Sequence, residues 1–335
     1  MGWEEACDQK PQRRLLAVSY TARLVPTAFT RGGFPMPLVS VIMNVRNGSA
    51  FLREALDSVM AQSFQDWELI VWDDCSTDAS ADIVGKYHDP RIRYFLSPQD
   101  TPLGKARDNA IRQATGQWLA FLDQDDVWLP YKLEEQLALA ADGVGIIYGR
   151  TVMFQAGRKL GDYDYAHEFT LLPKGDIFAQ LFADGCFIAM SSAVLLRSAV
   201  VEAGGIPDTI EVVPDYYLYV ALGRRYRARA VQEVICLYRK HAGSLTRSNS
   251  PRLHAEPLLL IDQWKDCLDP RIVAYRRMTY STALAWDEMQ RLKTALDGIV
   301  RLFTQGSALW LLGRPFVHAW RAARRKIRRP YWLSS

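Results

Sequence analysis

Acidic side chains gather at two points of the sequence, and each group directly follows a short apolar run. Asp73 and Asp74 come after the run 69–72, and Asp123-Gln124-Asp125-Asp126 comes after the run 118–122. Carboxylates spaced as Asp-x-Asp in a turn can hold a divalent cation, and magnesium typically takes one or two carboxylates while substrate phosphates fill other positions. The second group therefore predicts a cation site that binds a diphosphate. Its alternative role is structural, with Asp125 and Asp126 capping a helix that begins near Pro130.

The elements around these acids alternate between strand-like and helix-like patterns from residue 38 onward. Short apolar runs at 38–45, 69–72, 92–96 and 118–122 alternate with segments of helical periodicity such as 103–114. This alternation predicts an α/β fold with a mainly parallel sheet flanked by helices. Ligands of such sheets bind outside the carboxyl ends of the strands, where both acidic groups fall. We therefore expect the two groups to meet in one crevice.

No Gly-x-Gly-x-x-Gly follows the first expected strand, which argues against a dinucleotide-binding protein. Other segments match a known pattern in the right order along the chain: Val39–Asn47, Trp72–Asp78, Ala106-Arg107, Ala114–Gly116, Phe121–Pro130, Gly204–Asp208, Asp215–Leu218 and Tyr238–Leu245. Together they resemble family 2 glycosyltransferases over about residues 37–247. The resemblance implies a GT-A fold and transfer of a sugar from a nucleotide-diphosphate donor, with inversion at the anomeric carbon.

The resemblance also implies roles for individual residues. Asp215 matches the catalytic base of the family. The residues that match nucleotide contacts are Asp73, which resembles the nucleobase contact, Asp74, Arg107 and Asp123. The residues that match the site of the cation, Mg²⁺ or Mn²⁺, are Asp123, Asp125 and His241. A carboxylate only accepts hydrogen bonds, so Asp73 suits a base with a ring N–H on its edge, as in uracil, thymine and guanine. We expect a UDP sugar as the donor, with dTDP and GDP sugars next.

Each role has a structural alternative. Asp73 could form an Asx turn at the end of a strand. Arg107 could be a solvated helix residue, and His241 an exposed loop histidine. Asp215 could be a first-turn acid that the helix dipole favours.

Some residues depart from the family pattern. Asn44 replaces the usual proline, Arg46 the usual tyrosine, Cys75 a glycine and Asp108 an asparagine. We expect these four changes to alter the donor pocket. Pro214 stands where an acid often precedes Asp215, which leaves the base without its usual acidic neighbour.

Composition bounds the rest of the molecule. The chain has 335 residues, of which 49% are hydrophobic, and a formal net charge of +4. Residues 306–335 hold seven Lys or Arg and no Asp or Glu, so the basic character belongs to the tail. We therefore expect no nucleic-acid partner but an anionic membrane surface, although a packed helix with a solvated end is the alternative. Five scattered cysteines indicate a reducing compartment.

We expect three regions: a poorly ordered extension over 1–36, a GT-A domain over 37–249, and a helical C-terminal region over 250–335 with a basic amphipathic tail. The expected protein is a cytoplasmic glycosyltransferase, peripheral on the inner face of the cell membrane. Its expected acceptor is a cell-surface glycan or a lipid-linked acceptor. The alternatives are a nucleotidyltransferase and a non-catalytic protein that binds a nucleotide sugar or a glycan.

Overall fold

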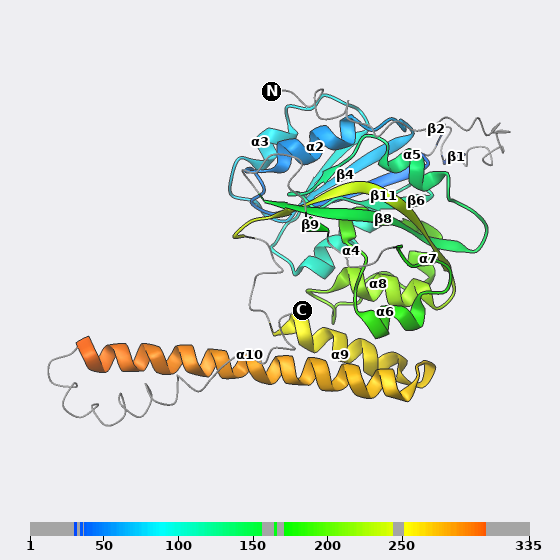
Figure 1. Ribbon diagram of the computed structural model, residues 1–335. Helices are drawn as coiled ribbons and strands as arrows, with labels where there is room; N and C mark the ends of the chain where they lie inside the picture. The colour runs from blue at the N-terminus through cyan, green and yellow to red at the C-terminus, as the bar shows by residue number, and fades with distance from the viewer. Residues whose placement is uncertain are drawn as a thin grey trace.

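The computed structural model describes residues 30–31, 34–35, 37–155, 164–165, 171–243 and 251–305. Within these ranges, one mixed sheet of nine strands forms the centre of the molecule (Figure 1). Its order across the sheet is β5 (Ile92–Leu96), β4 (Trp67–Asp73), β3 (Val39–Val45), β6 (Trp118–Phe121), β10 (Val194–Leu196), β8 (Val144–Gln155), β11 (Arg227–Lys240) and β7 (Val127–Trp128), while β9 (Asp164–Tyr165) pairs with β8.

The first half of the sheet is parallel and sets the position of the site. Strand β3 pairs in parallel with β4 on one side and with β6 on the other, and β5 continues the parallel order beyond β4. The chain therefore changes its direction of travel across the sheet between β3 and β6. Ligands of open α/β sheets bind at such a switch point, outside the carboxyl ends of the strands. The two acidic groups follow β4 and β6 at this same end.

The other half contains antiparallel pairs, because β10 runs antiparallel to both β6 and β8. Strands β8 and β11 are parallel to each other, and β7 pairs antiparallel with β11. The sheet is thus mixed and mostly parallel, and the expected α/β class is confirmed.

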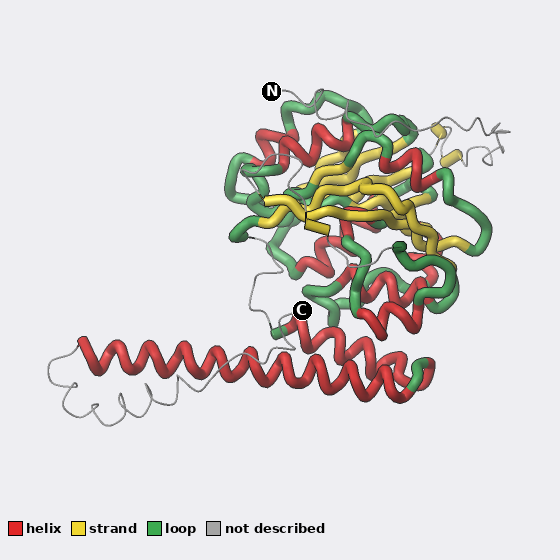
Figure 2. Tube along the Cα trace, in the orientation of Figure 1, coloured by secondary structure: helices red, strands yellow, loops and turns green. Residues whose placement is uncertain are grey.

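Helices cover both faces of the sheet, since successive residues of a strand point to opposite sides. Val41 and Met43 of β3 pack with the helices α2 (Leu52–Met60), α3 (Ser80–Val84) and α5 (Lys132–Leu137). Ile42 packs on the other face with α4 (Leu103–Gln113), α6 (Phe178–Asp184), α7 (Arg197–Glu202) and α8 (Pro214–Gly223). Figure 2 shows the two helical layers on either side of the strands.

The C-terminal region contains a long helical hairpin made of α9 (Arg252–Trp264) and α10 (Pro270–Gln305), with the short turn η3 (Lys265–Cys267) between them. The hairpin lies beside α6 and α8, and α10 extends past the rest of the molecule (Figure 1). Leu260, Ile261 and Trp264 of α9 belong to the same buried cluster as α6 and α8. Helix α9 therefore shares the core of the sheet domain.

Both ends of the chain carry expectations that fall largely on residues outside the described ranges. Within 1–36, β1 (Thr30–Arg31) pairs antiparallel with β2 (Phe34–Pro35). The basic tail over 306–335, for which we expect membrane binding, lies wholly outside those ranges. None of the helices that the structure describes combines the length and the apolar character needed to cross a bilayer.

Candidate active site

A cavity of about 970 Å³ lies at the carboxyl ends of the parallel strands, a size that suits a small-molecule ligand. The structure brings residues from both acidic groups to this cavity, together with candidates from distant parts of the chain. The expected site residues that line it are Asp74, Arg107, Asp123, Asp125, Asp215 and His241.

Asp123 and Arg107 form an ion pair at the edge of the sheet. Asp123 follows β6, and its Oδ1 lies 2.7 Å from Nη2 of Arg107 on α4. The Arg107 side chain is only 5% exposed, so the alternative of a solvated arginine does not hold. Burial raises the pKa of the Asp123 carboxyl, and Arg107 opposes that shift. A guanidinium held here can donate to the phosphate oxygens of a nucleotide.

Asp125 and Asp126 face different surroundings. Asp125 Oδ2 lies 2.7 Å from Nε2 of His241, a residue that follows β11, so this histidine faces the acidic turn. Asp126 is 1% exposed and accepts hydrogen bonds from the Ser191 hydroxyl and the Arg239 backbone N–H. Burial raises its pKa well above the usual range. Neither carboxylate caps α5, which begins at Lys132 without a side-chain cap.

Arg239 holds this acidic turn in place, a role that the sequence did not reveal. Its side chain is 6% exposed, and Nε donates to the backbone oxygen of Asp125 at 2.8 Å. Nη2 pairs with Glu54 of α2, and the guanidinium lies over the rings of Phe51 and Phe154 at 4.6 and 4.5 Å. The residue stands within the segment Tyr238–Leu245 that resembles the family, but only the fold shows what it contacts. Ser191, which bonds to Asp126, gave no sequence signal.

The donor set suits a hard divalent cation that shares its coordination with a ligand. Among the described residues, no cluster of three or more His, Cys, Asp or Glu side chains is arranged to hold a metal ion unaided. Asp123 and Asp125 nevertheless offer carboxylate oxygens to one cavity, with His241 beside Asp125. Mg²⁺ is commonly held by one or two carboxylates plus substrate phosphates, so these residues fit that cation or Mn²⁺.

Asp73 does not lie where the sequence placed it, whereas its neighbour does. Asp73 Oδ1 accepts the Ser76 backbone N–H at 2.8 Å, and Oδ2 accepts the Tyr94 hydroxyl at 2.7 Å. It is 1% exposed and is absent from the cavity lining. Asp74 lines the cavity, and its carboxylate accepts the hydroxyl and the backbone N–H of Thr101. Asp73 therefore has a structural role at the end of β4, where its side chain turns toward β5, although it bonds to the N–H three residues on and not two, as an Asx turn would.

Of the four departures from the family pattern that we expect to alter the donor pocket, two line the cavity and two do not. Asn44 and Arg46 line it, and the Asn44 Nδ2 is buried with no hydrogen-bond partner among the described residues. Cys75 has φ of +59°, a conformation in which the family glycine would be unstrained. Asp108, like Cys75, lies outside the cavity lining, and it accepts the backbone N–H of Ile206. The expected effect of Cys75 and Asp108 on the donor pocket therefore stays a prediction.

Asp215 reaches the cavity from the first turn of α8. Pro214 occupies the first helical position, where its fixed φ and missing N–H fit. Asp215 Oδ1 accepts the Tyr216 backbone N–H at 2.8 Å. Burial raises the pKa of the Asp215 carboxyl, and Arg107 opposes the shift. The residue is thus a first-turn acid that also lines the cavity.

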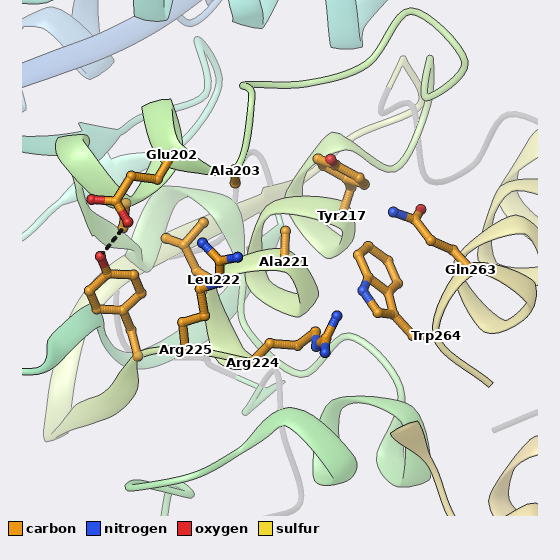
Figure 3. Close-up of a pocket in the computed structure, with 11 residues that line it drawn as sticks. Glu202, Ala203, Tyr217, Ala221, Leu222, Arg224, Arg225, Gln263 and Trp264 are labelled. Atoms are coloured by element: carbon orange, nitrogen blue, oxygen red, sulfur yellow. Dashed lines mark hydrogen bonds between the residues drawn. The ribbon is translucent and has the colours of Figure 1, made fainter. Parts of the chain in front are cut away.

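A second cavity of about 240 Å³ lies between α7, α8 and α9 (Figure 3). Its one carboxylate belongs to Glu202, which accepts the Tyr226 hydroxyl at 2.9 Å. Because this cavity lacks the paired carboxylates of the larger one, it does not suit a cation and a diphosphate.

Comparison with solved structures identifies the fold. The chain matches S. aureus TarS 1–349 in complex with UDP-GlcNAc with a TM-score of 0.56 and 19% identity, over 67% of this chain and 65% of that one. It matches the mannosyltransferase PcManGT from Pyrobaculum calidifontis, in complex with GDP-Man and Mn²⁺, with a TM-score of 0.54 and 18% identity, over 85% and 84% of the two chains. At such identities the likeness shows the fold alone. It confirms the expected GT-A fold.

Sequence comparison identifies the family. The chain is 34% identical over 186 residues to the UDP-Glc:alpha-D-GlcNAc-diphosphoundecaprenol beta-1,3-glucosyltransferase WfgD of Escherichia coli, which covers 55% of this chain and 69% of that protein. It is 37% identical over 136 residues to TuaG of Bacillus subtilis (strain 168), covering 39% of this chain and about half, 54%, of TuaG. The model of Glycosyl transferase family 2 matches residues 40–204. The chain belongs to glycosyl transferase family 2.

Proposed function

We propose that this protein is an inverting glycosyltransferase that moves a sugar from a nucleotide-diphosphate donor, preferably a UDP sugar, to a hydroxyl of a lipid-linked or cell-surface glycan. One observation carries the proposal: a single cavity at the switch point of the sheet is lined by acids from both groups, by Arg107 and by Asp215. The donor and acceptor classes are supported by the E. coli relative, whose name gives UDP-Glc as donor and a diphosphoundecaprenol-linked sugar as acceptor.

In this proposal, different side chains of the cavity bind the nucleobase, the diphosphate and the cation. Asp74 takes the nucleobase role that the sequence assigned to Asp73, because it is the one of the pair that lines the cavity. Arg107 lies against Asp123 and can donate to the diphosphate. Asp123 and Asp125, with His241 beside them, would hold Mg²⁺ or Mn²⁺, which when bound neutralises charge on the departing diphosphate.

Asp215 is the general base in this proposal. Inverting transfer is a direct displacement, so the acceptor oxygen attacks from the side opposite the diphosphate and loses its proton to a group on that side. Asp215 comes from α8, whereas the diphosphate residues come from α4 and from the turn after β6. Its raised pKa makes it a better proton acceptor than an ordinary aspartate near neutral pH.

The test measures release of the nucleoside diphosphate from UDP, dTDP and GDP sugars, with and without a lipid-linked sugar acceptor. It compares the wild-type protein with Asp125→Asn. Wild type should turn over one donor when cation and acceptor are present. Asp125→Asn should abolish that turnover and remove the manganese dependence of nucleotide binding, because an amide is a poorer ligand for a hard cation. Full wild-type activity in the presence of a chelator would contradict the cation role.

Asp215→Asn separates an enzyme from a binding protein. The variant keeps the side-chain shape and loses the basicity, so it should bind donor normally while turnover falls by about two to four orders of magnitude. A non-catalytic nucleotide-sugar-binding protein would show no acceptor-dependent turnover in either form.

A further inference from the structure

Helix α9 contacts the segment that leads into α8, close to the candidate base. Glu256 on α9 is only 1% exposed although its side chain is ionisable. Its carboxylate oxygens accept hydrogen bonds from the backbone N–H groups of Glu211, Val212 and Val213, over distances of 2.9 to 3.2 Å. Asp215 follows two residues after this segment.

Glu256 supplies a hydrogen-bond acceptor at the start of α8 that the N-cap residue of this helix lacks. The N-cap of that helix is Val213, whose side chain has no oxygen to accept a hydrogen bond. The N–H groups that Glu256 accepts belong to the N-cap and to the two residues before it, and the positive end of the helix dipole nearby also favours a negative partner. Glu256 supplies it from a different helix, and hydrogen bonds to a carboxylate are stronger than those between neutral groups.

The same segment is held from its other side by α4. The Gly104 backbone N–H donates to the backbone oxygen of Glu211 at 3.0 Å. A Cβ atom at Gly104 would lie 1.9 Å from the backbone oxygen of Ile210, so the two backbones are in direct contact. Helix α4 also carries Arg107, which pairs with Asp123. The segment 210–213 therefore links α9 to the helix that supports the diphosphate side of the cavity.

Helix α9 is itself firmly packed on the catalytic domain. Trp264 lies against Tyr217 of α8, with ring centroids 6.0 Å apart and the ring planes tilted by 44°, and Figure 3 shows the two side chains next to each other. Leu253 and Pro257, on either side of Glu256, line the large cavity, as does Tyr280 of α10. The hairpin thus forms one wall of the cavity and bonds to the segment that presents the base.

We propose that Glu256 is a positioning residue that fixes the place of Asp215 in the cavity, so that the C-terminal hairpin is a working part of the catalytic centre. This inference rests on the proposed function, in which Asp215 takes the proton of the acceptor. A base acts only within hydrogen-bond reach of that proton. A displacement of about 1 Å at such a group can cost on the order of 100-fold in rate.

The experiment compares Glu256→Gln with a matched variant, Glu68→Gln. Glu68 is also a buried carboxylate that accepts a backbone N–H, from Thr115, but it stands at the start of β4, at the far end from the cavity. In Glu256→Gln one carbonyl oxygen replaces two acceptors for three N–H groups. We expect its kcat for transfer to fall about 10- to 100-fold while the donor Kd stays within about twofold. Glu68→Gln should keep kcat near the wild-type value.

A second measurement follows the contact directly. Hydrogen exchange at the amides of residues 211–213 should be faster in Glu256→Gln than in wild type, and unchanged in Glu68→Gln. Glu256→Asp serves the same comparison if the glutamine variant does not fold, because its shorter side chain keeps the charge and shifts the segment.

Wild-type kcat in the Glu256 variants would overturn the proposal, and so would a joint loss of donor binding and kcat. A wild-type chain that transfers no sugar from any donor would refute the proposed function itself, and the base-positioning role with it. That result needs no substitution to be seen, so the two failures are distinguishable.

Discussion

Asp73 and Asp74 are neighbours in the chain, yet the fold gives them different tasks. Asp73 ends a parallel strand with both carboxylate oxygens bonded to Ser76 and Tyr94. Asp74, one residue later, lines the cavity beside Thr101. We therefore expect mutation of these two adjacent acids to have different effects, on stability for Asp73 and on nucleotide binding for Asp74.

We expect Asp73→Ala to lower the free energy of unfolding by about 1–3 kcal/mol, because it removes two partly buried hydrogen bonds, from the Ser76 backbone N–H and from the Tyr94 hydroxyl, each worth about 0.5–1.5 kcal/mol. Its nucleotide affinity should stay near that of wild type. Asp74→Ala should weaken binding of the whole nucleotide without changing the preference among sugars. Calorimetric titration with UDP, paired with thermal unfolding, measures both. The reverse pattern would return the nucleobase role to Asp73.

The pKa of Asp215 predicts how transfer depends on pH. Burial raises this pKa above the usual 3.8 of an aspartate, and a base works only when deprotonated. Turnover should therefore fall as the pH drops through the raised pKa, at a higher pH than an ordinary aspartate would give. A pH profile of kcat/KM measures this, and an acidic limb at or below pH 3.8 would exclude Asp215 as the base.

The same shift predicts an effect on stability. A carboxyl whose folded pKa exceeds its unfolded pKa favours unfolding when it is charged, and the folded state gains stability as the pH falls from the folded toward the unfolded value. Asp215→Asn should therefore be at least as stable as wild type at pH 7.5 while it loses transfer. Thermal unfolding of both proteins at a series of pH values below 7.5 tests this, and the difference in stability between variant and wild type should narrow as the pH falls through the raised pKa.

At the scale of elements, the site depends on how closely α4 approaches the segment before α8. Gly104 lies in the first turn of α4, and a Cβ atom there would clash with the backbone of Ile210. Gly85, which follows α3, has helical φ and ψ, and its nearest neighbour to an added Cβ lies 3.4 Å away. The two glycines form a matched pair for testing this contact.

Gly104→Ala should push the segment 210–213 away from α4 and reduce kcat for transfer about 10- to 100-fold. Gly85→Ala should leave kcat unchanged and alter stability by less than about 1 kcal/mol. Steady-state kinetics with saturating donor measures the first effect, and thermal unfolding the second. Equal kcat in both variants would show that the segment tolerates displacement.

At the scale of the whole molecule, the core runs from the sheet through α8 into the C-terminal hairpin. Trp264 of α9 lies near Tyr217 of α8 and Phe182 of α6, and Arg276 of α10 donates to the backbone oxygens of Phe182 and Ala183. The N-terminal strands β1 and β2, in contrast, pair only with each other among the strands of the structure. We therefore expect removal of the C-terminal hairpin to lower stability far more than removal of the N-terminal segment.

Deletion of residues 1–36 should leave the melting temperature and turnover near their wild-type values, because the strands of the sheet begin at Val39. Ending the chain after residue 250 should instead expose the apolar surface of α6 and α8 and cause a large loss of folded protein. Nucleotide at one hundred times its Kd should stabilise the first variant by about 2.7 kcal/mol, as it does the intact chain. A large fall in melting temperature on removing 1–36 would show that this segment packs on the domain.

The sequence by itself determined the fold class, the family and the segments that meet at the cavity. Strand and helix periods differ, so alternating patterns specify a parallel sheet, and parallel strands must bring the residues after their carboxyl ends to one edge. The acids after β4 and β6 could be placed there without coordinates. The positions of Asp123, Asp125 and Asp215 in the cavity follow from that geometry and from the resemblance.

Only the tertiary structure decided which of the two neighbouring acids lines the cavity and which distant residues hold the acidic turn and the segment before α8 in place. The choice between Asp73 and Asp74 depends on how β4 ends against β5. A sequence pattern locates the end of the strand but does not predict which of two consecutive side chains points into the cavity. Glu256 bonds to backbone N–H groups more than forty residues away, and Arg239 bonds to a backbone oxygen more than one hundred residues away. Backbone atoms are the same at every position, so the sequence gives no signal for these contacts. Buried charges are stable only when their partners converge on them, and that convergence exists only in three dimensions.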